Sequence, residues 1–108
     1  MLDISTGKVV RVIALAREFG PDNGRLRDYI SGLNVDEQVS LVACMWIGRE
    51  SFMADELEDA LATARAERTA PTEDYLTGIP ELASFLEDGM DALGINVADE
   101  EDRLRERG

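Results

Sequence analysis

The chain has 108 residues, of which 44% are hydrophobic and 31% are charged, and its formal net charge is −12. This length fits one domain with one hydrophobic core. A surface this negative repels the phosphates of nucleic acids and of anionic membranes, so we expect neither as a partner.

The sequence predicts a cytoplasmic location. No apolar stretch approaches the ~20 residues that a membrane-crossing helix needs. Charged residues such as Asp3, Lys8 and Arg11 interrupt the N-terminal stretch that a signal peptide would keep apolar. Cys44 is the only cysteine, so the chain forms no internal disulfide, which fits a reducing compartment.

The acidic charge is unevenly distributed along the chain. Residues 1–49 carry six basic and six acidic side chains, whereas residues 50–108 carry five basic and 17 acidic ones. The second part would therefore favour a basic protein partner. The alternative is that these acidic side chains only keep a small protein in solution.

Two helices are predicted before the central part of the chain. Apolar residues at helical spacing indicate a first helix from Ser5 or Thr6 to about Phe19, which Gly20-Pro21 would end. A short second helix is expected over residues 25–33.

The most apolar part of the chain predicts a central helix over about residues 35–47. Asn34 precedes it and Glu37 follows three residues later, which is the pattern of a capping box. Gly48 would end this helix in the left-handed conformation. Apolar residues cover more than one face of the helix, so we expect it to be buried nearly all round.

A fourth helix is expected over about residues 54–68. In the loop before it, Ser51 is a candidate cap, and we expect Phe52 and Met53 to pack back onto the core. The first two turns carry a candidate acidic interaction face, which consists of Asp55, Glu56, Glu58 and Asp59.

Two further helices complete the predicted fold. Thr72 can cap a short helix over residues 73–77, and Pro80 is well placed as the first residue of a helix that ends near Leu93. Gly89 lies in the apolar stripe of this last helix, which favours a close approach to a neighbouring helix.

These elements predict an all-α fold, a single-domain irregular bundle of five or six helices around the central helix. The domain would span residues 1–94. Residues 99–107 are all charged except Leu104, so we expect residues 95–108 to form a mobile or weakly helical tail. No segment has the alternating pattern of a strand.

The composition argues against most catalytic chemistry. The chain has no histidine, which excludes Ser-His and Cys-His nucleophile systems and the commonest zinc ligand. Cys44 lies in the apolar stretch, which favours inert packing. Acidic helix faces can bind Mg²⁺ or Ca²⁺, but no calcium-loop pattern is present. We expect no catalytic residue, no metal site and no cofactor.

Three residues are candidates for a binding site. Arg49 follows the central helix beside Trp46, and its guanidinium could bind a carboxylate or a phosphate. The alternative is an internal ion pair with Glu87 or Asp88. Tyr75 is either a ligand contact or an edge of the core with a hydrogen-bonded hydroxyl.

Two groups of residues carry a resemblance. The first joins Leu41-Val42-Ala43 to Trp46-Ile47-Gly48-Arg49, and the second starts with Tyr75-Leu76-Thr77-Gly78-Ile79-Pro80 and continues to Gly94. Over residues 4–94 the chain resembles a family of small proteobacterial proteins known as a domain of unknown function. The resemblance implies a compact helical bacterial domain and supplies no activity, substrate or site.

The sequence thus favours a non-enzymatic interaction or regulatory module, whose acidic half would meet a basic partner or whose apolar faces would pair in a homodimer. The alternative is a domain that binds a small molecule or an anion near Trp46, Arg49 and Tyr75. A third hypothesis is an enzyme that acts through carboxylates.

Overall fold

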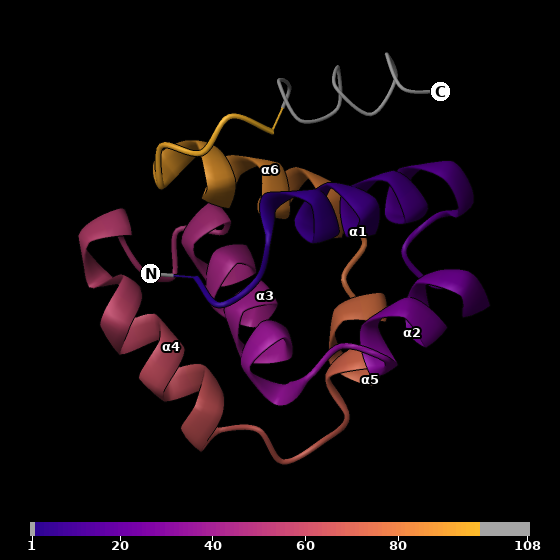
Figure 1. Cartoon of the computed structure of the whole chain (residues 1–108), viewed down its shortest axis with the longest axis horizontal. Helices are drawn as coiled ribbons and strands as arrows, with labels where there is room; N and C mark the ends of the chain where they lie inside the picture. Colours follow the sequence, from indigo (N-terminus) through magenta and orange to yellow (C-terminus); the bar gives the residue numbers. More distant parts are fainter. Residues whose placement is uncertain (1, 98–108) are drawn as a thin grey trace.

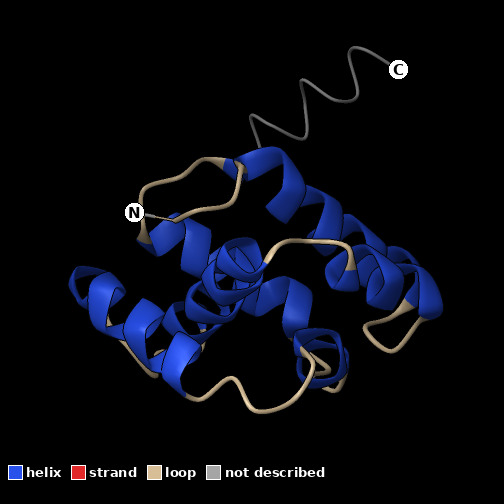
Figure 2. Ribbon diagram, turned by 60° about the horizontal axis from the view of Figure 1, so that its bottom comes forward, coloured by secondary structure: helices blue, strands red, loops and turns tan. Residues whose placement is uncertain are grey.

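The computed structural model describes residues 2–97, and this part of the chain is all-α (Figure 1). Figure 2 shows helices joined by loops, with no strand among the described residues. One turn of 3₁₀ helix, η1 (Ala54–Glu56), precedes the fourth of six α-helices: α1 (Thr6–Phe19), α2 (Gly24–Ser31), α3 (Val35–Gly48), α4 (Leu57–Ala66), α5 (Thr72–Thr77) and α6 (Leu82–Ala92). No described helix is long and apolar enough to cross a membrane.

Polar side chains fix where the first three helices begin. Ser5 and Asn23 each accept a hydrogen bond from a backbone N–H in the first turn of α1 and α2. Asn34 does the same for α3, and the Glu37 carboxylate accepts the Asn34 N–H at 3.0 Å. This reciprocal pair is the predicted capping box, which satisfies two backbone groups that the helix itself leaves unpaired.

Helix α3 is the centre of the bundle, as predicted. Every residue from Glu37 to Met45 is buried, including the polar side chains of Gln38 and Ser40. In Figure 1, α4 lies on one side of α3, α2 and α5 lie on the other, and α6 crosses it. The most extensive packing is between α3 and α6, so this crossing carries the largest share of the core.

Two glycines allow the backbones of α3 and α6 to touch. A Cβ at Gly48 would collide with the carbonyl of Phe85, and a Cβ at Gly89 would collide with the carbonyl of Cys44. The predicted close approach at Gly89 is therefore confirmed. The prediction for Gly48 is wrong, because Gly48 is the last helical residue of α3 and its φ is not positive.

The left-handed residue that ends α3 is Glu50, with φ of 68°. The Ser51 N–H donates to the carbonyl of Trp46 at 2.9 Å, and the Glu50 N–H donates to the carbonyl of Ile47 at 3.0 Å. These two bonds form a Schellman motif, which glycine usually completes. Gly48 is therefore required for the close contact with α6, and Glu50 occupies the left-handed position of the turn.

The start of the fourth helix differs from the prediction. Ser51 does not cap it, because its hydroxyl accepts a hydrogen bond from Arg49 Nε at 3.1 Å. The chain enters through η1, where the Glu56 carboxylate accepts the Met53 N–H at 2.7 Å. The side chain of Met53 is 63% exposed, so its predicted burial is wrong. Phe52 stacks on Trp46, which agrees with the expectation that Phe52 packs back onto the core.

The last two helices begin within two residues of their predicted positions, which is the usual uncertainty of helix ends. Thr72 is the first residue of α5 and follows Pro71 at the capping position, and α6 begins two residues after Pro80. Gly94 ends α6 with a φ of 78°.

The C-terminal boundary at residue 94 stays a prediction. Val97 is buried and Ile95 packs against the core, so both continue the packing of the domain. Residues 98–108, which make up most of the expected tail, lie outside the described residues.

Candidate ligand-binding pocket

A pocket of about 290 Å³ opens between α3, α4 and α5. Its apolar floor comes from Val39 and Val42 on one face of α3 and from Ala64 of α4, and Trp46, one turn further along the same face of α3, forms part of the wall. Its walls come from the end of α4, the loop after it and α5, through Glu67, Arg68, Thr69, Ala70, Thr72 and Tyr75.

Trp46 and Tyr75 meet at the pocket, so the structure brings two of the three predicted site residues together. The indole Nε1–H of Trp46 donates a hydrogen bond to the Tyr75 hydroxyl at 2.9 Å. On its other side Trp46 stacks on Phe52, with ring centroids 5.7 Å apart and an interplanar angle of 23°. Both contacts fix the indole plane as a rigid apolar wall.

The pocket's guanidinium belongs to Arg68. Arg68 Nη2 donates to Gln38 Oε1 at 2.7 Å. Gln38 is buried, and its Nε2 donates to the carbonyls of Ile30 and Leu33 at 2.9 and 3.2 Å, which leaves only its oxygen for Arg68. A guanidinium has five N–H donors, so an anchored Arg68 retains donors for a bound anion.

Arg49, the third predicted site residue, does not line this pocket. Its Nε bonds to Ser51, and its expected ion pair with Glu87 or Asp88 is not formed. Glu87 instead pairs with Arg17 of α1, since α6 lies against α1. The sequence contains one signal for Arg68, which is the polar Gln38 at the start of the most apolar helix.

Thr72 supplies a hydroxyl at the pocket wall. Only 4% of the residue is exposed, yet it lines the pocket. Its side chain makes no hydrogen bond to the residues that the structure describes, and none of these residues has a sealed side-chain N or O atom without a partner. The Thr72 hydroxyl therefore faces the pocket and is available to a ligand.

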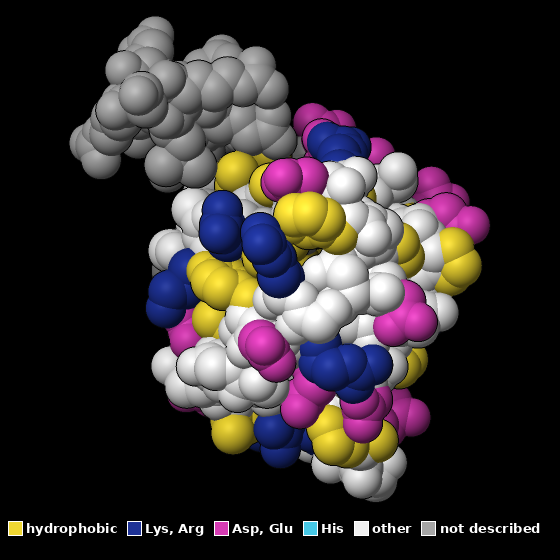
Figure 3. All heavy atoms as spheres, turned by 90° about the vertical axis from the view of Figure 1, so that its right-hand side faces the viewer, with side chains coloured by type: hydrophobic (Ala, Val, Ile, Leu, Met, Phe, Trp, Pro, Cys, Tyr) yellow, Lys and Arg dark blue, Asp and Glu magenta, His cyan; other side chains and the backbone are white. Residues whose placement is uncertain are grey.

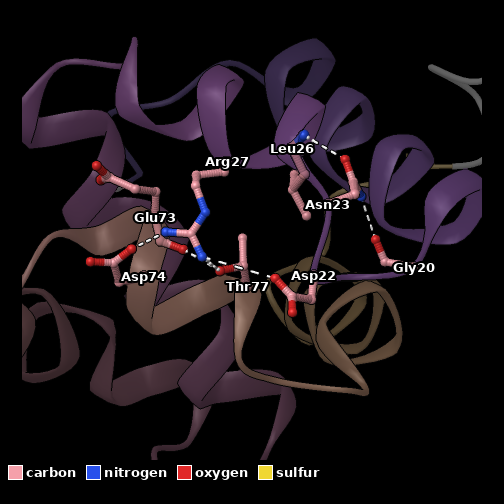
Figure 4. A network of polar contacts seen from close by, with 8 residues as sticks. All are labelled: Gly20, Asp22, Asn23, Leu26, Arg27, Glu73, Asp74 and Thr77. Carbon is pink, nitrogen blue, oxygen red and sulfur yellow. Dashed lines mark hydrogen bonds and ion pairs between the residues drawn. The ribbon is translucent and has the colours of Figure 1, made fainter.

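Polar contacts of Arg27 hold α5 against α2 (Figure 4). These contacts also fix Thr72 and Tyr75, which belong to α5. The guanidinium of Arg27 contacts the Asp74 carboxylate and donates to the Thr77 hydroxyl at 3.0 Å. Asp22 lies 3.9 Å from the same guanidinium. Thr77 in turn donates to the carbonyl of Glu73 at 2.7 Å, so this six-residue helix is fixed at both ends.

The candidate acidic face lies apart from the pocket. Asp55, Glu56, Glu58 and Asp59 are all exposed, and none of them lines the pocket. Among the described residues no group of three His, Cys, Asp or Glu side chains is arranged to hold a metal ion. The face in Figure 3, which looks onto the right-hand side of Figure 1, carries basic and acidic side chains together.

Cys44 lies in the core beneath the α3–α6 crossing. It is fully buried, and its Sγ contacts the carbonyl of Leu86 at 3.6 Å. Burial raises the pKa of the Cys44 thiol from 9.0 to about 12, because the thiolate would lose its hydration. The predicted inert packing of this thiol agrees with that position.

Comparison with known proteins places the chain in a family but gives it no activity. A family model described as "Protein of unknown function (DUF3775)" matches residues 23–95. The match runs from the Asn23 cap of α2 to Ile95, so it contains every residue that lines the pocket. No curated protein and no solved structure matches the chain.

Proposed function

The chain belongs to the DUF3775 family, and we propose from the pocket between α3, α4 and α5 that it is a non-enzymatic domain that binds a small molecule. The observation that carries the proposal is the arrangement of the pocket around an apolar floor. The pocket wall contains the hydrogen-bonded pair Trp46 and Tyr75, and it also contains Arg68, which is bonded to the buried Gln38. Ligand sites combine an apolar lining with a few fixed polar groups in this way.

The proposal includes a cytoplasmic location in a proteobacterium. The buried free thiol of Cys44 fits a reducing compartment. The origin rests on the resemblance of the two sequence signatures.

Ligand binding is tested by the melting temperature of the protein in the presence of a panel of small carboxylates, phosphates, amines and amino acids. A ligand at about 100 times its Kd adds about 2.7 kcal/mol to the free energy of unfolding. For a domain of this size that stabilisation raises Tm by several degrees.

A matched pair of variants assigns the effect to the pocket. Ala70→Phe places a ring in the pocket from an exposed loop position, whereas Ala62→Phe adds the same ring at an exposed position of α4 that does not line it. We expect at least one compound to raise Tm of the wild type and of Ala62→Phe, and not of Ala70→Phe. No response from the wild type, or an equal response from Ala70→Phe, contradicts the proposal.

A second candidate function is the recognition of a basic protein by the acidic face. It is favoured by Asp55 and Asp59, which are exposed and form no ion pair with a basic side chain of the described residues. The test is a pull-down from lysate at low and at high salt, with the double variant Asp55→Asn, Asp59→Asn as control. A partner that is lost at high salt and in the variant supports this function. A partner that the wild type and the double variant retain equally argues against it.

A further inference from the structure

The end of α4 places opposite charges next to each other at the pocket. Glu67 and Arg68 are consecutive residues, and both line the cavity. The last carbonyl groups of a helix carry partial negative charge, which adds to the negative side of this pair. This part of the wall therefore offers a group for a cation beside a group for an anion.

A ligand with a single charge fits this wall poorly. An anion at Arg68 would lie close to the carboxylate of Glu67, and it would approach a protein whose net charge is −12. A cation at Glu67 would lie close to the guanidinium of Arg68. A zwitterion places one charge on each residue and has no net charge, so neither repulsion applies.

The volume limits the size of the ligand. The cavity of about 290 Å³ lies at the lower end of the volumes of small-molecule sites, which suits a small ligand. The apolar floor of Val39, Val42 and Ala64 requires that a large part of this ligand be hydrocarbon.

We propose that the pocket binds a free α-amino acid with an apolar side chain of medium size, for which leucine is the model. The inference rests on the proposed function. The carboxylate would accept hydrogen bonds from Arg68 and from the Thr72 hydroxyl, and the ammonium group would lie at Glu67. The side chain would lie on Val39 and Val42, against the indole of Trp46.

The same geometry disfavours a peptide terminus. The N-terminus of a peptide has no carboxylate next to its amine, and its C-terminus has no amine next to its carboxylate. Either end would satisfy one member of the Glu67–Arg68 pair and leave the other unpaired.

The test uses three probes of nearly equal shape, which are L-leucine, 4-methylpentanoate without the amine and 3-methylbutylamine without the carboxylate. Trp46 is the only tryptophan and lines the pocket, so its fluorescence reports binding of each probe. We expect leucine to bind at least about threefold more tightly than either analogue, because each analogue leaves Glu67 or Arg68, both exposed at the pocket wall, without its opposite charge.

Two variants separate ligand contacts from structural effects. Glu67→Gln should weaken binding of leucine while 4-methylpentanoate binds as well as before or better, since the nearby negative charge is gone. Arg68→Gln should weaken binding of leucine and of 4-methylpentanoate, but not of 3-methylbutylamine. A role in folding alone would weaken all three probes together, so melting curves of both variants accompany the titrations.

The outcomes distinguish this inference from the proposed function. If an analogue with one charge binds the wild type as tightly as leucine, the pocket is a binding site but the ligand need not be a zwitterion, and this inference is wrong. A further outcome is that leucine, methionine and phenylalanine all fail to bind while other compounds raise Tm of the wild type but not of Ala70→Phe. In that case the pocket binds a ligand, and the proposal that this ligand is an amino acid is wrong. If no compound acts through the pocket, both proposals are wrong.

Discussion

Glu50 is the one described residue other than glycine that has a positive φ, at 68°. A side chain in the left-handed region costs about 1 kcal/mol relative to glycine. We therefore predict that Glu50→Gly raises the free energy of unfolding by about 0.5–1 kcal/mol. Urea denaturation followed by circular dichroism measures the change.

Glu67→Gly is the matched control for Glu50→Gly. Glu67 also ends a helix, but its φ is −92°, where a glutamate is unstrained. Glycine at this position should therefore bring no gain in stability. An equal gain from both substitutions would show that the left-handed conformation of Glu50 is not a source of strain.

Gly89 carries the opposite kind of constraint, because it needs the absence of a side chain rather than a special φ. A Cβ at this position meets the backbone of Cys44, which cannot move aside like a flexible side chain. We predict that Gly89→Ala lowers the free energy of unfolding by about 1–3 kcal/mol or more. Thermal melts of the purified variant provide the measurement.

Gly24→Ala tests whether any methyl group added to a helix has this effect. Gly24 is the first residue of α2, and a Cβ there meets nothing within 4 Å. This variant should be unchanged or more stable by up to about 1 kcal/mol, because alanine restricts the unfolded chain. A similar loss in both variants would mean that the α3–α6 contact is not the cause.

Among the helices, the start of α3 links stability to pH. The pKa of Glu37 is lowered by the hydrogen bond from Lys8, and further by the backbone N–H of Asn34. The pKa of Lys8 is raised mainly by the same hydrogen bond. A carboxyl with a lowered pKa in the folded state adds stability above its unfolded value of 4.5 and loses it as the pH falls.

We therefore predict that the melting temperature falls as the pH drops through 4.5, and that part of this fall is absent in Glu37→Gln. Melting curves between pH 7 and pH 3 give the comparison. Glu73→Gln is the control, because the Glu73 carboxylate forms no ion pair with a basic side chain of the described residues. If Glu37→Gln and the wild type lose stability in parallel, the Lys8–Glu37 pair does not contribute to the pH dependence.

The elements that the sequence predicts best are those with local signals. Asn34 and Glu37 mark the start of α3 through a cap that involves four consecutive residues, and the apolar stretch defines its burial. The end of α3 was not predictable in the same way. Gly48 looked like a helix stop, but its role depends on Phe85 of α6, which is distant in sequence.

Considered as a whole, the molecule explains why the candidate site was only partly predictable. Trp46 and Tyr75 are predictable, because Trp46 is the only tryptophan and lies three residues before Arg49, and Tyr75 is one of only two tyrosines. Arg68 lies beyond the end of α4, and its place at the pocket depends on the packing of α4 against α3 and on Gln38. No periodic pattern along the chain encodes that contact, so Arg49 was predicted in its place.

The net charge of −12 also acts on the whole molecule. It lowers the local concentration of anions near the surface, and this effect weakens as salt screens the charges. Binding of a neutral zwitterion should therefore change little between low and high salt. Binding of 4-methylpentanoate should become tighter as salt is added.

The single indole N–H resonance of Trp46 tests the central claim most directly. This N–H donates to Tyr75 at the pocket, and no other tryptophan contributes a signal. Titration of ¹⁵N-labelled protein with L-leucine should shift the resonance and saturate in the wild type and in Ala62→Phe, and should leave it unmoved in Ala70→Phe. A resonance that stays in place for the wild type with leucine and with the wider panel of small molecules would contradict the assignment of this pocket as a binding site.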